Sequence, residues 1–341
     1  SLTYDGYEPS KEKLREALCT LGNGYMATRG SAPESSEGDH HYPGTYIAGI
    51  YDILESEVQG RRIENESNVN LPNWSYVSFK VEDGDWFELD NVRIDDYRRE
   101  LDMRCGVLKR KVVFTDDHGR RTTVRDRRFV SMEEPNLAAL EVEITPENWS
   151  GRMTVRTALD GNVGNTLVKR YRELDNDHLM HLGSGAGDPG TLWLDVETKQ
   201  SRVRVAQAAR TKVFNDGGTA AGRVPVLERS IARQDIEVDA ARERTVRVEK
   251  IAAIHSSRDR AISDPVTGCL DLLRHSGGFD ELLADHSKRW ETLWSRYGFE
   301  VDPGHMWISQ TLNMHIFHML GNVSVHSVDM DVGIAPRGLA G

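Results

Sequence analysis

The stretch Leu140-Glu141-Val142-Glu143-Ile144 alternates apolar and charged side chains, and this alternation decides the fold class. Successive side chains of a β-strand point to opposite faces, so a period of two places one face in a core and the other in water. Thr245-Val246-Arg247-Val248-Glu249 and Arg202-Val203-Arg204-Val205 repeat the pattern. The three stretches predict half-buried β-strands.

The middle of the chain, from about residue 45 to about residue 256, continues in the same way. Asp83-Gly84 and Asp117-His118-Gly119 are turn signals between apolar runs. Further strands are expected at residues 76–81, 86–94, 107–115, 121–131, 153–159, 191–196 and 225–236. Many strands with almost no helical pattern between them indicate a mainly β fold, a large antiparallel β-sandwich rather than a parallel sheet.

The pattern changes near residue 260. Apolar side chains from Phe279 to Tyr297 recur at helical offsets, which predicts a helix of about five turns that Gly298 ends. Trp290 and Trp294 lie on its apolar face, so the helix needs a substantial partner surface.

A second helix is expected from Gly304 to Leu320. Its end, Ile316-Phe317-His318-Met319-Leu320, is apolar almost all round and therefore needs burial on several sides. His315 and His318, three residues apart, would suit a metal ion, but no third ligand has a suitable spacing. The expectation is therefore two partly buried histidines and no metal.

Composition excludes several classes of function. The net charge of the 341 residues is -11, and phosphate contacts need a basic face, so no nucleic-acid partner is expected. No apolar run approaches 18 residues, which argues against a membrane span. Cys19, Cys105 and Cys269 lie far apart without a Cys-x-x-Cys pair, which predicts no disulfide framework and fits a reducing, cytoplasmic compartment.

The stretch Gly22-Asn23-Gly24-Tyr25-Met26-Ala27 matches the dinucleotide-binding pattern G-x-G-x-x-A. That pattern needs a strand before it and a helix after it, so that the pyrophosphate lies at the helix N-terminus. Arg29-Gly30-Ser31-Ala32-Pro33 follows and would break such a helix. We therefore favour a turn that leads into a sandwich over a nucleotide-binding loop.

The candidate binding residues are Asn68, Asn70, Asn73 and Trp74. Amides offer donors and acceptors, and an indole offers a flat apolar face, which is the mixture that sugar recognition needs. The equally weighted alternative is a turn-rich strand connection with its tryptophan in the core. Glycoside chemistry would need two acids held across a pocket, and none of the 54 acidic residues stands out as such a pair.

Several stretches resemble, in order, the N-terminal part of glycoside hydrolase family 65, which includes maltose, trehalose and kojibiose phosphorylases. The resemblance runs nearly end to end and departs at Ala27-Thr28, where relatives often have glycine. The matching stretches are Leu21-Gly22-Asn23-Gly24-Tyr25 with Arg29-Gly30, Gly44-Thr45-Tyr46-Ile47-Ala48-Gly49-Ile50-Tyr51, Asn70-Leu71-Pro72-Asn73-Trp74, Leu101-Asp102-Met103-Arg104-Cys105-Gly106-Val107-Leu108, the helix with Trp290 and Trp294, and Ala335-Pro336-Arg337-Gly338-Leu339-Ala340-Gly341.

The resemblance implies a galactose-mutarotase-like super-sandwich over residues 1–258 and a helical linker over residues 259–302. Residues 303–341 would hold a second helix and the beginning of an (α/α)6 catalytic barrel. In this family a general-acid Glu protonates the leaving oxygen, while phosphate or water attacks the opposite face of the sugar with inversion. Those groups lie in the barrel, which the chain lacks, so no catalytic residue carries over.

We therefore expect a truncated, non-catalytic N-terminal region of an inverting α-glucoside phosphorylase or hydrolase, inactive by itself. The resemblance implies three partners: the missing barrel, a second copy of the chain in a homodimer, and an α-linked glucose disaccharide such as maltose, trehalose or kojibiose. Inorganic phosphate would be the co-substrate of a phosphorylase, and no cofactor is expected. The alternative is a stand-alone carbohydrate-binding or scaffolding sandwich, which must bury the Trp290 and Trp294 face within its own fold.

Overall fold

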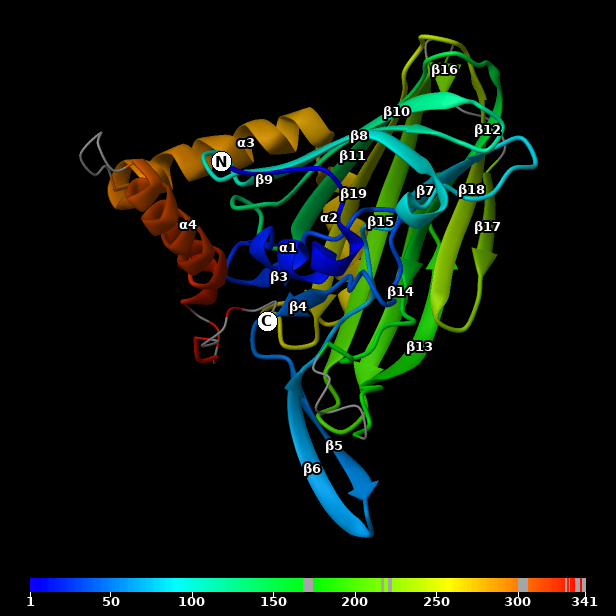
Figure 1. Cartoon of the computed structure of the whole chain (residues 1–341). Helices are drawn as coiled ribbons and strands as arrows, with labels where there is room; N and C mark the ends of the chain where they lie inside the picture. Colours follow the sequence, from blue (N-terminus) through cyan, green and yellow to red (C-terminus); the bar gives the residue numbers. More distant parts are fainter. Residues whose placement is uncertain are drawn as a thin grey trace.

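The computed structural model describes residues 1–167, 174–215, 218–219, 223–299, 306–328, 330, 332–334 and 338. Antiparallel strands form its body, and the main helices follow towards the C-terminus (Figure 1). The strands are β1 (Leu2–Asp5), β2 (Leu21–Gly22), β3 (Met26–Thr28), β4 (Thr45–Ile47), β5 (Tyr51–Val58), β6 (Arg61–Asn68), β7 (Val77–Val81), β8 (Arg93–Asp102), β9 (Val107–Thr115), β10 (Arg121–Val130), β11 (Leu137–Pro146), β12 (Gly151–Asp160), β13 (Leu179–Ala186), β14 (Thr191–Thr198), β15 (Arg204–Asn215), β16 (Gly218–Thr219), β17 (Arg223–Leu227), β18 (Ile231–Ala240) and β19 (Val246–Ser256). The helices are α1 (Glu12–Leu18), α2 (Pro265–His275), α3 (Phe279–Tyr297) and α4 (Met306–Asn322), with the 3-10 turns η1 (Pro9–Lys11), η2 (Leu89–Asn91) and η5 (Val325–Ser327).

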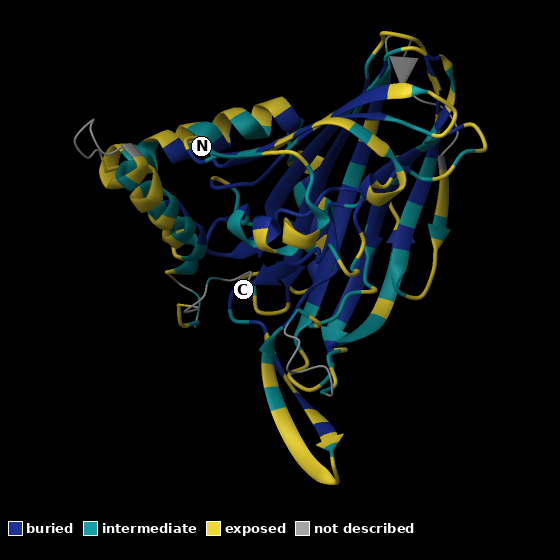
Figure 2. Cartoon of the chain, in the orientation of Figure 1, coloured by how far each residue is buried: buried dark blue, intermediate teal, exposed yellow. Residues whose placement is uncertain are grey.

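Two antiparallel sheets make the sandwich. The larger sheet runs in the order β1-β8-β9-β10-β11-β19-β15-β14-β13, with β16 paired to β15, and the smaller runs β17-β18-β12-β7. Their inner faces share one apolar cluster, which appears as the dark interior of Figure 2. The expected mainly β, antiparallel sandwich is confirmed.

The alternating stretch in β11 behaves as its period predicts, with one modification. Leu140, Val142 and Ile144 are buried in the core. Glu141 points to the other face but is also buried, because Arg127 Nε donates to its carboxylate at 2.6 Å and Arg247 Nη1 at 3.0 Å. The charged positions of this sheet therefore pair with neighbours on adjacent strands as well as facing water.

Most of the expected strands are present, and three expectations were wrong in whole or in part. The stretch Arg202–Val205 is only half strand, because Arg202 has a φ of +55° and β15 begins at Arg204. Residues 86–94 do not form one strand, because Phe87 turns inward onto Phe79, with ring centroids 5.2 Å apart, and η2 follows before β8 begins. Residues 225–236 form two strands, because a turn in which the Glu228 N–H donates to the Ile231 carbonyl separates β17 from β18.

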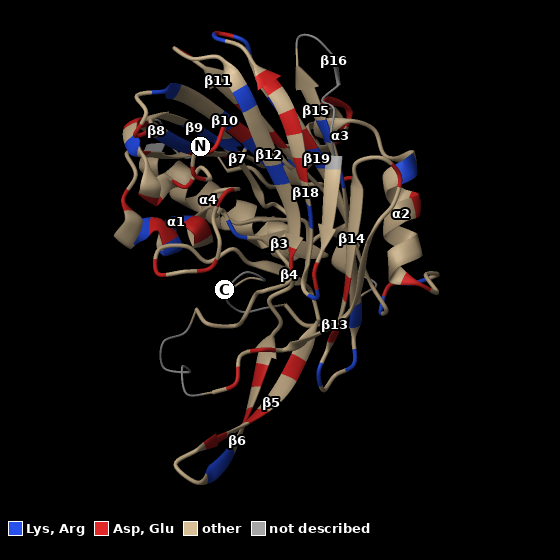
Figure 3. Cartoon of the chain, turned by 90° about the vertical axis from the view of Figure 1, so that its right-hand side faces the viewer, with Lys and Arg blue, Asp and Glu red and all other residues tan. Residues whose placement is uncertain are grey.

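The sequence interpretation did not identify the hairpin of β5 and β6, which extends away from the sandwich (Figure 1). Glu55 faces Glu64 across this hairpin, and Ile53 faces Glu66. The ribbon of both strands carries the red of Asp and Glu in Figure 3. A stretch with charges on one face and few buried contacts carries a weak apolar period, so composition alone did not reveal it.

Helix α3 has the predicted bounds and ends at Gly298. Its residue Trp290 is buried and stacks on Phe317 of α4, with ring centroids 4.8 Å apart. The Gly304 start expected for the second helix lies outside the described residues, and the helix continues past Leu320 to Asn322. Within the described ranges, no helix combines the length and apolar character that a membrane crossing needs.

The expected division at residues 258 and 302 stays a prediction. Helix α2, the first helix of the expected linker, packs directly on β15 and β19 of the large sheet. This helix is therefore in close contact with the sandwich. Most of the stretch Ala335 to Gly341, which resembled the beginning of a barrel, lies outside the described residues.

Candidate functional site

The glycine-rich stretch forms a short hairpin between β2 and β3, with Leu21 opposite Thr28 and Gly22 opposite Ala27. Asn23 closes the turn, because its Oδ1 accepts from the backbone N–H of Tyr25 at 3.0 Å and of Met26 at 2.9 Å. No helix follows, so the dinucleotide-binding alternative fails and the turn that we favoured is what the chain forms.

Two glycines of this hairpin allow the backbone of α4 to approach closely. A Cβ at position 22 would lie 2.5 Å from the carbonyl oxygen of Gly321. Gly24, whose φ is +87°, donates its N–H to that same oxygen at 2.9 Å. Glycine is required at position 22 by the close contact and at position 24 by the backbone conformation.

The turn over residues 131–136 joins this hairpin to α3 and to the 3-10 turn η5. Asn23 Nδ2 donates to the carbonyl oxygen of Ser131 at 2.6 Å. The Met132 N–H donates to Nδ1 of His286 on α3 at 3.0 Å, and the Met132 carbonyl accepts from Nε2 of His326 at 2.9 Å. Burial lowers the pKa of His286 to about 4, so this imidazole stays neutral and accepts the Met132 hydrogen bond.

Tyr25 leaves the hairpin and meets a carboxylate at the end of β19. Its hydroxyl lies 2.9 Å from Oδ1 and 2.8 Å from Oδ2 of Asp259. Asp259 Oδ2 is also 2.8 Å from His255 Nδ1 and 3.2 Å from Asn136 Nδ2, and Ser256 donates through its hydroxyl and its backbone N–H. Burial opposes ionisation of Asp259, but the hydrogen bonds from His255, Ser256 and Tyr25 outweigh it and hold its pKa below the ordinary value.

A pocket of about 420 Å³ opens above this cluster. Its polar lining comprises Tyr25, Asn136, His255, Ser256, Asp259 and the two arginines Arg258 and Arg260, and Ala48 and Ile50 are among its apolar residues. His326, Met330 and Val332 line it from the C-terminal segment. This pocket is our candidate functional site, because side chains from three distant parts of the sequence meet there around one ionised carboxylate.

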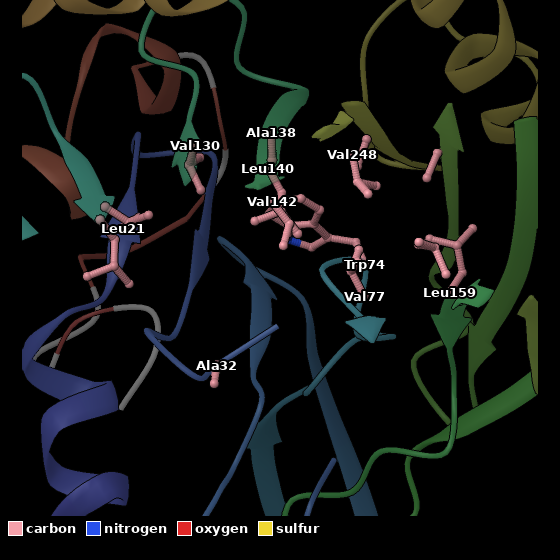
Figure 4. Packing of buried hydrophobic residues seen from close by; sticks show 14 of the residues in the cluster. Leu21, Ala32, Trp74, Val77, Val130, Ala138, Leu140, Val142, Leu159 and Val248 are labelled. Carbon is pink, nitrogen blue, oxygen red and sulfur yellow. The ribbon is translucent and has the colours of Figure 1, made fainter. Parts of the chain in front are cut away.

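The predicted binding residues do not reach this pocket. Trp74 is 1% exposed, lies among the core side chains labelled in Figure 4, and donates from Nε1 to Thr28 Oγ1 at 3.0 Å. Asn70 and Asn73 are buried: Asn70 Oδ1 accepts from the Thr45 N–H at 3.1 Å, and Asn73 Oδ1 from the Ser75 N–H at 3.0 Å. Asn68 ends β6 at the base of the hairpin, where its carbonyl accepts from Asn165.

These contacts favour the alternative of a strand connection with its tryptophan in the core. Residues 70–76 cross between the sheets, and two side chains of the larger sheet hydrogen-bond to their backbone. Gln207 Nε2 donates to the Pro72 carbonyl at 2.9 Å, and Lys250 Nζ donates to the Tyr76 carbonyl at 3.1 Å. Contact of these side chains with a sugar stays an untested prediction.

The expectation of two partly buried histidines on α4 was right for His318 and wrong for His315, which is exposed. Burial lowers the pKa of His318, whose ring meets Phe317 edge-on with centroids 5.6 Å apart. Among the residues that the structure describes, His, Cys, Asp and Glu form no group of three that could hold a metal ion. The cysteines at positions 19, 105 and 269 are free thiols.

Sequence reasoning missed Asn136, His255 and Asp259. Tyr25 was part of the quoted motif, but its partners come from two segments more than 100 residues further along the chain, one directly before β11 and one at the end of β19. No spacing within one sequence links them. Only the pairing of β11 with β19 brings the two segments together.

Comparisons with known proteins agree with this architecture. A family model described as "Glycosyl hydrolase family 65, N-terminal domain" matches residues 2–293. An uncharacterized glycosyl hydrolase of Mycobacterium tuberculosis is 39% identical over all of this chain, and a kojibiose phosphorylase of Caldanaerobacter subterraneus is 32% identical over 96% of it. A solved structure described as a candidate kojibiose phosphorylase from the human microbiome is 17% identical but superposes with a TM-score of 0.79 over 94% of the chain, which supports the fold.

The chain spans 26% of the length of the Mycobacterium relative and 41% of the length of the Caldanaerobacter relative. The matched region therefore corresponds to one part of longer proteins. The chain belongs to glycosyl hydrolase family 65, and the family model that it matches is that of the N-terminal domain.

Proposed function

We propose that this chain is the non-catalytic N-terminal region of an inverting phosphorylase or hydrolase that acts on a glucose disaccharide such as maltose, trehalose or kojibiose. The family assignment supports the proposal, as does a relative named for kojibiose phosphorolysis that is more than twice as long as this chain. The general acid and the phosphate site belong to a separate catalytic domain, so the chain alone is inactive. Phosphate is then a co-substrate of the complete enzyme only.

The observation that carries this proposal is the two-sided character of α4. One side packs on α3 and on the β2–β3 hairpin, because Phe317 stacks on Trp290 and Gly321 contacts Gly22. The other side and the residues after it leave large apolar side chains in water: Trp307, Leu312, Met319, Val325 and Val328. An apolar surface of this kind marks a contact with another protein surface, and we assign it to the catalytic domain that would follow α4.

One observation favours the stand-alone alternative. The face of α3 that carries Trp290 is buried within this chain's own fold, against Phe317 and the sandwich, as a self-sufficient sandwich requires. The exposed side of α4 separates the two proposals, because a protein that functions alone gains no stability by leaving large apolar side chains in water.

The free thiols fit a cytoplasmic location, which we propose together with the enzyme assignment.

The experiment places a charge on that exposed side. Met319 is 68% exposed, so Met319→Glu should leave the melting temperature of the 341-residue chain unchanged. In a longer enzyme that contains the chain and a catalytic domain, the same substitution should lower both the melting temperature and kcat. Leu14→Glu is the matched control, because Leu14 is 62% exposed on α1. Equal behaviour of the two variants in the longer enzyme would contradict docking at α4.

A further inference from the structure

We propose that the pocket beside Tyr25 is a sugar-binding site formed by this chain alone, with room for a glucose disaccharide. The inference goes beyond the proposed function, because it needs no catalytic domain. It rests on the unused hydrogen-bonding atoms, the charge and the dimensions of the pocket.

The Asp259 carboxylate fixes the orientation of the histidine above it. An ionised carboxylate only accepts hydrogen bonds, so the 2.8 Å contact places the proton of His255 on Nδ1. Nε2 then presents a lone pair, and it makes no hydrogen bond with any residue in the described part of the chain. His255 lines the pocket, so the lone pair is available to a hydroxyl group of a ligand.

Asn136 supplies the second unused group. Its Nδ2 donates to the Ile254 carbonyl at 2.8 Å and to Asp259 at 3.2 Å, which determines how the amide is turned. Its Oδ1 has no hydrogen-bond partner among the described residues and belongs to a pocket-lining side chain. Both His255 and Asn136 are at least nine-tenths buried, so these two acceptors are held in place before a ligand arrives.

The mixed lining suits a polyol, whose hydroxyl groups both donate and accept hydrogen bonds. Asp259 lies beside the two acceptors, and Arg258 and Arg260 bring positive charge to the same pocket. The half-buried side chains of Met330 and Val332 line the same pocket and suit the C–H face of a pyranose. The pocket volume lies within the range of about 300–1,000 Å³ that is typical of small-molecule sites.

An adjoining cavity of about 670 Å³ gives room for a second sugar ring. The two cavities share Arg258 and Val332. Tyr51 lines the second cavity at the start of β5 and is 37% exposed, so part of its side chain is open to a ligand. The ring at the His255 end would be bound by hydrogen bonds, and the ring at the Tyr51 end by stacking.

The first experiment titrates glucose and kojibiose into the 341-residue chain by saturation-transfer NMR and calorimetry. Tyr51→Ala should weaken kojibiose about tenfold and leave glucose unchanged, because it removes only the stacking surface. Tyr297→Ala is the matched control, since Tyr297 is 50% exposed on α3 far along the sequence from the pocket. Absence of saturable binding, or an equal effect of Tyr51→Ala on both sugars, would overturn the proposal.

The second experiment tests His255. His255→Ala should weaken both sugars about tenfold, whereas His275→Ala on the exposed end of α2 should change neither. If His255→Ala fails to fold, imidazole ¹⁵N spectra of the unmodified chain provide the answer. Added glucose should shift the Nε2 resonance of His255, and outside this pocket no histidine resonance should move. An unchanged His255 resonance, or a shift only at histidines outside the pocket, would place the sugar elsewhere or exclude it.

Discussion

Residues 21–30 and residues 68–74 are both rich in glycine or asparagine, and both lie against the sandwich, but their polar groups have different fates. In the first segment, Asn23 closes a turn and Tyr25 reaches an ionised carboxylate at a pocket. In the second, Asn70, Asn73 and Trp74 bind only protein atoms in the interior. A segment rich in amides and aromatic side chains can therefore bind a ligand only where its amides are not already hydrogen-bonded to the backbone.

The largest expected effect tests whether the second segment is structural. Trp74→Ala should lower the free energy of unfolding by about 3–5 kcal/mol, because it empties a large, fully buried site and leaves Thr28 without its indole partner. Urea denaturation followed by circular dichroism measures the loss. Trp74→Phe should cost clearly less, because it keeps most of the packing. A marginal effect of the alanine variant would mean that Trp74 does not support the core.

The next effect concerns the turn that anchors the first segment, through His286. The pKa of this buried imidazole is about 4, against about 6.5 in an unfolded chain, so below pH 6.5 the unfolded state binds the proton first. The neutral, buried His286 therefore contributes fully to the free energy of unfolding above pH 6.5. This contribution falls as the pH drops towards 4, and the total loss is about 3 kcal/mol.

Urea titrations of the chain between pH 7 and pH 4 measure this dependence. His286→Gln removes the titrating group and keeps an acceptor for the Met132 N–H, so its stability should vary less over the same range. An identical pH dependence in the variant and the unmodified chain would show that other groups cause it.

The smallest of the three effects tests the contact between the first segment and α4. Gly22→Ala introduces a Cβ 2.5 Å from the Gly321 carbonyl oxygen, and the rigid backbone on both sides should make this cost about 1–3 kcal/mol. Differential scanning calorimetry measures the loss. Gly38→Ala is the control, because a Cβ there meets no atom within 4 Å. A tolerated Gly22→Ala would mean that α4 can shift away without consequence.

Sequence reasoning recovered the parts of the fold that local periodicity encodes. The alternation in β11 and β19 and the helical offsets of α3 are properties of single segments, and the structure follows them. The hairpin of β5 and β6 was missed because its charges obscure the apolar period. The pocket was missed because Asn136, His255 and Asp259 become neighbours only when β11 pairs with β19.

The prediction of a sugar contact at residues 68–74 stays untested, and the structure favours the structural alternative for a different physical reason. The amide of Asn73 and the indole of Trp74 have the chemistry that a sugar site needs, and composition cannot say whether such groups face a ligand or the chain itself. Their partners, among them Ser75 and Thr28, are unremarkable in sequence. Only burial distinguishes the two situations.

The most direct test of the account compares turnover by the purified 341-residue chain with turnover by a longer enzyme that contains it. Each is incubated with maltose, trehalose and kojibiose, with and without phosphate, and glucose 1-phosphate and glucose are followed by ³¹P and ¹H NMR. We predict that the longer enzyme converts at least one disaccharide with inversion at the anomeric carbon and that the chain converts none. Turnover by the pure chain would contradict the assignment of catalysis to a separate domain.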